Sequence, residues 1–206
     1  MRHLIFFFVL LSASCNLYPN AVQSQKPETI SSWSLQHYSA NPPPVKKLLN
    51  FALTLAGKNL GYRYGSADPK HGGMDCSGTV YYLLTSLGIK NVPRPSHLIY
   101  KWVKEKGHFH AVNTLDLNSA QFAKMRPGDI LFWNGTYRVQ HNPNITHVML
   151  YLGKNKAGQP LMIGASNGRS YNKRKIYGVS VFNFDLPHAS SKSKFLGYSC
   201  IPHLSC

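Results

Sequence analysis

Residues 75–87 read DCSGTVYYLLTSL, in which four polar or small residues lead into a mainly apolar run of helical length. Asp75 is a residue type that caps helix N-termini, because its carboxylate accepts hydrogen bonds from free amides of the first turn. The run ends at Gly88, a residue typical of helix C-termini. The cap puts Cys76 in the first turn, where unpaired amides and the helix dipole lower the pKa of a thiol. We therefore expect a reactive thiolate at Cys76, with an inert, buried cysteine as the alternative.

His147 is the residue that we expect to serve Cys76 as a base. A thiol nucleophile needs such a group to take up its proton and return it to the leaving amine, and the chain has 10 histidines. His147 opens a predicted strand, residues 147–153, whose apolar residues at even positions share one face. Because side chains alternate along a strand, His147 projects from the other face, toward a cleft. A histidine satisfied in the core or at the surface is the alternative.

A zinc site is the other chemistry that the histidines suggest. His108 and His110 form a His-x-His pair, and His141 and Cys76 are further ligand types. The pair lacks the ligand-like spacing to a third residue that zinc sites normally show. We therefore expect neither a metal nor another cofactor.

The order of the predicted elements indicates one α+β domain over residues 45–187. Apolar residues recur at helical spacing first, and short strands bounded by turn residues follow. Helices followed by an antiparallel meander are typical of α+β domains. The predicted helices are 45–56, 79–87 and 97–106, and the predicted strands are 130–133, 147–153, 160–163 and 179–184.

The first residues predict export. Residues 1–15 combine a short positive start, an apolar run from residue 4 to 11 and small residues before Cys15, as in a signal peptide. Cys15 could receive a lipid, although Ser12 stands where lipoprotein signals usually carry Leu. Residues 16–44 are polar and end in three prolines, which predicts an extended tether. We expect a periplasmic, envelope-anchored or secreted protein.

The C-terminal residues 188–206 are predicted to be a tail. They contain Cys200 and Cys206, which an oxidising compartment would allow to pair. Cys76 is then left without a partner, as a reactive thiol would be.

The charge balance identifies the kind of partner. The chain has 23 Lys and Arg against 7 Asp and Glu, a formal net charge of +16 that attracts polyanions. Without a zinc-finger spacing or an RNA-binding signature, we expect an anionic cell envelope rather than nucleic acid. So few acids also disfavour a glycosidase, which needs paired carboxylates, and a hard-metal site. We expect a monomer.

Five blocks of the chain together resemble the NlpC-type cell-wall endopeptidases, over about residues 45 to 185. The blocks are YRYG at 62–65, DCSG at 75–78, VPR at 92–94, RPGDILF at 126–132 and HVMLYLG at 147–153. The resemblance implies a papain-like fold and a cysteine peptidase that cuts peptidoglycan stem peptides, often between D-glutamate and diaminopimelate. It implies Cys76 as nucleophile, His147 as base and the backbone around Cys76 as oxyanion hole.

Four residues are candidates for substrate binding. The resemblance implies that Tyr62 contacts the active site. Asp75 and Ser77 flank the nucleophile, and Arg94 could bind a stem-peptide carboxylate through its bidentate fork. A structural ion pair is the alternative for Arg94.

The chain departs from the family pattern at the third catalytic position. Relatives commonly carry a histidine there that orients the catalytic imidazole, and this chain has Gly164. Asn serves that role in papain-like proteases generally, so we expect Asn167 to orient His147. Ser166, Asn183, a water molecule or no group at all are the alternatives. A second departure is Ile99, where relatives often carry Gln.

Two other functions stay open at this stage. One is a wall-binding module that lost catalysis together with the third residue. The other is a papain-like acyltransferase acting on lipid, although permuted enzymes of that kind place His before Cys, and here Cys76 precedes His147.

Overall fold

The computed structural model describes residues 27–206. The predicted signal peptide, the lipid-anchor site Cys15 and the first part of the predicted tether lie outside these residues. No helix in the part of the chain that is described is long and apolar enough to cross a bilayer.

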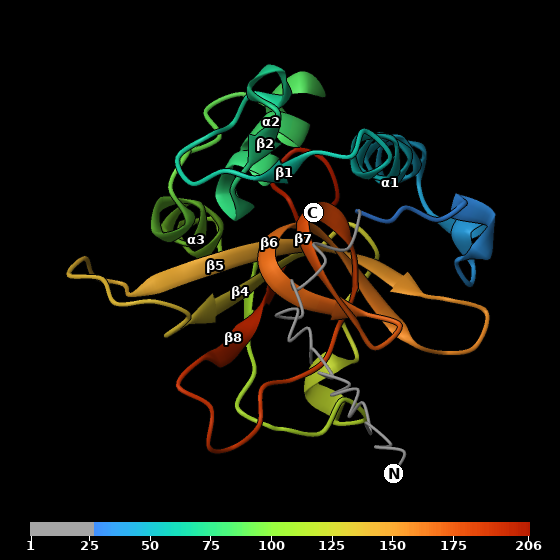
Figure 1. The fold of residues 1–206 in the computed structure, drawn as a ribbon. Coiled ribbons are helices and arrows are strands. Elements are labelled where there is room, and N and C mark those ends of the chain that lie inside the picture. Colours follow the sequence, from blue (N-terminus) through green and yellow to red (C-terminus); the bar gives the residue numbers. More distant parts are fainter. Residues whose placement is uncertain (1–26) are drawn as a thin grey trace, which may run out of the picture.

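A six-stranded antiparallel sheet forms the centre of the fold (Figure 1). The four predicted strands are confirmed. Three of them extend beyond the predicted limits, and the fourth, predicted over 179–184, begins at Arg174 and ends at Asn183. The strands lie in the order β3-β8-β4-β5-β6-β7. Their bounds are β3 (Phe109–Ala111), β4 (Ile130–Asn134), β5 (Ile145–Lys154), β6 (Pro160–Tyr171), β7 (Arg174–Asn183) and β8 (Lys194–Ser199).

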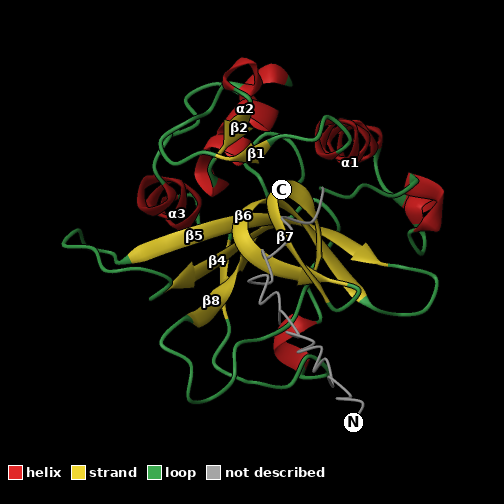
Figure 2. Ribbon diagram, viewed as in Figure 1, coloured by secondary structure: helices red, strands yellow, loops and turns green. Residues whose placement is uncertain are grey.

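Three helices cover one face of this sheet (Figure 2). They are α1 (Pro43–Ala56), α2 (Cys76–Ser86) and α3 (Ser96–Glu105), close to the predicted ranges. α1 packs on β6 and β7, α2 on β5 and β6, and α3 on β5. α1 begins with two prolines because the first helical turn needs no backbone N–H donors. The predicted α+β class is therefore confirmed.

The loop before α2 is held by a short parallel pair, β1 (Gly61–Tyr62) and β2 (Gly73–Met74). The Arg63 amide also donates to the Met74 carbonyl, at 3.0 Å. This pairing brings Tyr62 and the start of α2 together, although they lie 14 positions apart in the chain.

Residues 27–44 differ from the tether that we predicted. Leu35 is only 2% exposed and forms a bridge with Asn155. Farther upstream, the backbone of Glu28 exchanges hydrogen bonds with Ser180 and Val181 of β7. β7 is the outermost strand of the sheet, so its free backbone groups need a partner. The segment covers this edge and packs with the domain.

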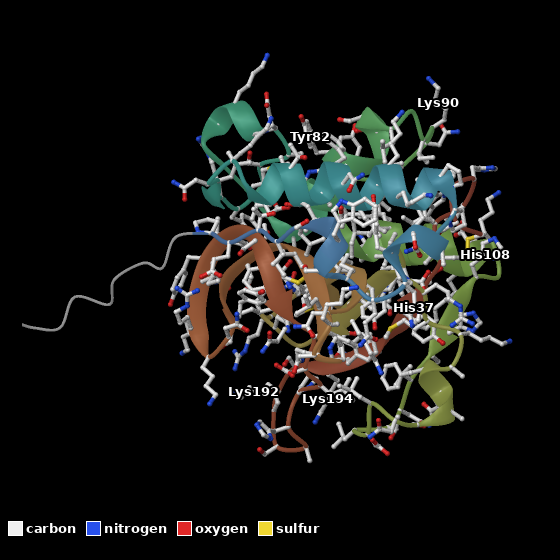
Figure 3. The ribbon with its side chains drawn as sticks, turned by 90° about the vertical axis from the view of Figure 1, so that its right-hand side faces the viewer. His37, Tyr82, Lys90, His108, Lys192 and Lys194 are labelled. Carbon is white, nitrogen blue, oxygen red and sulfur yellow. A yellow bond between two sulfur atoms is a disulfide. The ribbon has the colours of Figure 1, made fainter. Side chains whose placement is uncertain are left out.

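The C-terminal residues also differ from the predicted tail. β8 inserts between β3 and β4 inside the sheet, and its Tyr198 is almost completely buried. Cys200 and Cys206 form the disulfide that their spacing suggested, with a Cα–Cα distance of 5.2 Å. His108 lies beside this disulfide at the edge of the molecule (Figure 3). Because both sulfurs are bonded to each other, they are not available as metal ligands.

Candidate active site

Asp75 organises the loop around Cys76. Its Oδ1 accepts the Gly78 amide at 2.7 Å, which is the helix cap predicted from the sequence. Its Oδ2 accepts the Gly65 amide at 2.7 Å and Nη2 of Arg94 at 2.9 Å. One buried carboxylate thus joins α2, the preceding loop and the loop that leads to α3.

Arg94 links the two residues on either side of Cys76 through hydrogen bonds. Its Nη1 donates to Oγ of Ser77 at 2.7 Å while Nη2 donates to Asp75. Both terminal nitrogens of the guanidinium therefore have partners inside the protein, as in the ion-pair alternative. A contact with a substrate carboxylate at Arg94 stays a prediction.

Gly78 is required by close packing rather than by its dihedral angles. A Cβ atom at this position would lie 2.1 Å from the carbonyl oxygen of Ser66 and 2.8 Å from Nη2 of Arg94. The Ser66 carbonyl in turn accepts the Asp75 amide at 3.1 Å. The missing side chain allows the loop to press against the first turn of α2.

Cys76 is the first residue of α2 and has a free thiol, 6% exposed. Burial raises the pKa of this thiol to about 11, although backbone hydrogen bonds from Val148 and Ser77 and the charge of Arg94 act to lower it. Asp75 adds to the upward shift. The resting thiolate expected from the helix terminus is therefore wrong, because desolvation outweighs the local donors. At neutral pH the resting sulfur is a protonated thiol.

His147 lies on β5, the strand against which α2 packs. The Val148 backbone lies near enough to the Cys76 thiol to act on its pKa, so the sulfur faces this same stretch of β5. His147 is 8% exposed and opposes Trp133 of β4, with ring centroids 5.6 Å apart. Burial, followed by the charge of Arg169, holds the pKa of His147 well below its usual value. The resting imidazole is therefore neutral.

Two adjoining pockets surround these residues. One, of about 320 Å³, contains Cys76 and the other three loop candidates, Asp75, Ser77 and Arg94. The other, of about 530 Å³, contains His147. Tyr62 and Tyr137 line both pockets and so mark their junction.

Tyr62 thus lies between the pockets of Cys76 and His147, and its contact with a substrate stays a prediction. Burial and the nearby Cys76 raise the pKa of its hydroxyl. The neutral phenol can donate a hydrogen bond to a substrate at the junction of the pockets.

The position expected to hold an orienting histidine is filled from another strand. A Cβ atom on Gly164 would lie 3.0 Å from Cγ of Met149, so the Met149 side chain occupies that space. Asn167, our candidate for the orienting role, lines the rim of the His147 pocket. Its side chain is exposed and makes no hydrogen bond to any of residues 27–206.

Arg169 is the residue that contacts the imidazole, and we did not predict it. Its Nε donates to Nε2 of His147 at 3.3 Å. The pairing of β6 with β7 shifts register between Asn167 and Arg169, and Gly168 has a φ of 135°. Such a β-bulge re-aims the side chains that follow it. The predicted strand ended at residue 163, five residues before Gly168, so the sequence held no signal for this bulge.

A family model described as the NlpC/P60 family matches residues 59–180, more than half of the chain. The chain belongs to the NlpC/P60 family. The matched range includes both Cys76 and His147, together with the loop candidates and Arg169. The family recognised in the sequence is therefore confirmed.

Two relatives illustrate the similarity. The chain is 27% identical over 148 residues to murein DD-endopeptidase MepH of Escherichia coli K12, covering 68% of this chain and 48% of that protein. A solved Staphylococcus aureus Mu50 structure, similar to a lipoprotein of the NLP/P60 family, superimposes with a TM-score of 0.51 at 20% identity. That match covers 86% of this chain and 44% of the other. The papain-like fold is thus confirmed, and the chain spans about half the length of either relative.

Proposed function

We propose that this NlpC/P60 chain is a cysteine peptidase that hydrolyses amide bonds in peptidoglycan stem peptides. Cys76 is the nucleophile, and His147 is the base that later acts as the proton donor. The observation that carries the proposal is the thiol at the capped start of α2, a helix that packs on the strand of His147, where the thiol lines a pocket. Membership of the family and similarity to a murein endopeptidase support the substrate class.

The reaction starts from a neutral pair, a protonated thiol beside a neutral imidazole. His147 takes the thiol proton as the sulfur attacks the carbonyl carbon, as the base does in serine hydrolases. The free amides at the start of α2 face the developing oxyanion, and each such donor contributes roughly 3 kcal/mol or more. The C–N bond then breaks, the leaving amine takes the proton from His147, and water hydrolyses the thioester.

The bond between D-glutamate and diaminopimelate is our proposed cleavage site. In this arrangement the acyl part of the substrate lies in the Cys76 pocket, and Tyr62 donates a hydrogen bond from the junction. Similarity to a DD-endopeptidase makes the cross-link between stem peptides the competing bond. The masses of the released fragments distinguish the two.

We further propose that the protein acts in the bacterial cell envelope. The excess of 23 basic over 7 acidic residues attracts the anionic polymers and lipids of that compartment. Lys90 and Lys192 are exposed at opposite edges of the molecule, so the charge is spread over the surface (Figure 3). A lipid on Cys15 would attach the protein to the membrane. One acyl chain alone binds a membrane only weakly, so the basic surface would strengthen this attachment.

The test compares the full wild-type chain with Cys76→Ala on purified sacculi, with soluble fragments analysed by mass spectrometry. We expect fragments from the wild type and none from Cys76→Ala, which should still bind sacculi. If both proteins bind sacculi and neither releases fragments, the chain is a wall-binding module. If the wild type consumes a lipid ester instead of peptide, the acyltransferase alternative is correct.

A further inference from the structure

Arg169 places an uncompensated positive charge in the His147 pocket. In residues 27–206 the ion pairs are Arg94 with Asp75 and Arg174 with Glu28, so Arg169 has no such partner there. Asp185 lines the same pocket and attracts the guanidinium without reaching ion-pair distance. Arg169 is part-buried, and withdrawing an unpaired charge from water is costly. We therefore expect an anion to bind in this pocket and pair with Arg169.

The guanidinium is also well placed for such an anion. It lies over the Trp133 ring, with 4.4 Å between its central carbon and the ring centroid. Its Nε is engaged by His147, whereas Nη1 and Nη2 bond to no group among the described residues. Two parallel N–H groups on a stacked guanidinium match the two oxygens of a carboxylate.

The bond from Arg169 to His147 has a consequence for the base. A neutral imidazole has one nitrogen with a free lone pair, and its other nitrogen carries the proton. Here the lone pair is on Nε2, which accepts Nε–H of Arg169. The resting ring therefore has no free lone pair to take the proton of the Cys76 thiol.

We propose that Arg169 is a substrate-operated switch: it occupies the lone pair of His147 until a carboxylate on the amine side of the scissile bond draws the guanidinium away. The inference rests on the proposed peptidase function and names the feature of the substrate that this function requires. The amine side follows from chemistry, because the residue that protonates the leaving amine lies beside it.

Release of Arg169 restores the base. Once Arg169 has moved away, the neutral imidazole can adopt either tautomer by exchanging its proton with water. The nitrogen that faces the sulfur can then be the one with the free lone pair. The thiol proton then moves to the ring, the sulfur attacks, and the same proton goes to the leaving amine. A carboxylate also offsets the positive charge that disfavours an imidazolium. Only substrates with the carboxylate are cut rapidly.

The test uses a matched pair of peptides, L-Ala-γ-D-Glu-diaminopimelate and the same peptide with both diaminopimelate carboxylates amidated. We expect the wild-type chain to prefer the acid by about 10- to 100-fold in kcat/KM, the usual effect of a charge-assisted contact. In Arg169→Met, which packs on Trp133 but donates no hydrogen bond, that preference should fall close to 1. The kcat of Arg169→Met on the amidated peptide should exceed that of the wild type, because the lone pair is free.

The expected rise in the kcat of Arg169→Met on the amidated peptide distinguishes a switch from a structural role. If Arg169 were only structural, the variant would cut both peptides more slowly, by a similar factor. Lys175→Met, on the exposed part of β7, removes the same charge and should keep the wild-type preference. Arg169→Lys should keep part of it. If Arg169→Met lost the preference for the acid but its kcat on the amidated peptide did not rise, Arg169 would not be blocking the lone pair of His147, and the switch would be refuted.

The wild-type ratio decides the inference even if Arg169→Met does not fold. Equal cleavage of acid and amide by the wild type refutes the switch and leaves the peptidase function standing. Cleavage of neither peptide, together with intact sacculi, refutes the peptidase function, and the switch falls with it.

Discussion

Replacing Gly78 by alanine tests whether the close contact between α2 and its preceding loop holds the active site together. The new Cβ would lie 2.1 Å from the Ser66 carbonyl oxygen, well inside van der Waals contact, and 3.0 Å from Cα of Ala67. These atoms belong to the backbone and cannot move away by a change of rotamer. The loop must therefore shift by about 1 Å relative to the helix, given that real C···O contacts are about 3.3 Å or longer.

Two effects of opposite sign decide the magnitude. Overpacking costs about 1–3 kcal/mol, and the upper value applies because the obstacle is backbone. Alanine gains about 1 kcal/mol over glycine in a helix. The net loss is about 2 kcal/mol, which lowers the melting temperature by about 4–8 °C for a domain of this size. The same shift displaces the Asp75 amide, which bonds to the Ser66 carbonyl, so peptidase activity should fall as well.

Thermal unfolding followed by circular dichroism measures this loss. Gly61→Ala is the matched control, because its nearest atom lies 3.6 Å away, an ordinary contact, and its stability should change by less than about 0.5 kcal/mol. A Gly78→Ala protein that melts at or above the wild-type temperature would refute the packing argument.

Three further predictions concern titration and the third catalytic position. Because burial raises the pKa of Cys76 to about 11, its alkylation by iodoacetamide without substrate should stay slow at pH 7 and accelerate toward pH 11; a plateau reached by pH 7 contradicts this. Burial raises the pKa of Asp129 to about 7, so the unfolded chain releases this proton first and stability should fall from about pH 4 to 7; Asp129→Asn should flatten that slope in melting curves. Gly164→His should destabilise the fold by about 1–3 kcal/mol without raising kcat, because Met149 fills the site; a faster, equally stable variant would show that the space is available.

The position of Cys76 at the start of a capped helix was predictable because the signals for it are local. The cap at Asp75, the apolar run after it and the glycine at its end lie within one turn or a few turns of each other. The strand of His147 was equally clear from its alternation. The order of the five blocks added the family, and with it the fold.

Elements that depend on distant partners were missed. β8 reads as a tail in the sequence because its stability comes from pairing with β3 and β4, which precede it by about 60 to 90 residues of chain. Residues 27–44 were taken for a tether because the sheet edge that they cover is formed by β7, far along the chain. The amino-acid composition of these segments does not show with which strands they pair.

The sequence by itself determined the candidates for the chemistry, Cys76 and His147, since a capped helix start and a strand-opening histidine are local patterns. Only the tertiary structure decided their protonation states and their neighbours. Burial, which sums contributions from every strand and helix around the site, turns the expected thiolate at Cys76 into a thiol. One extra residue in the β6 ladder, at Gly168, brings Arg169 to the His147 imidazole and leaves Asn167 facing solvent. Register is a relation between two strands, so no single stretch of sequence specifies it.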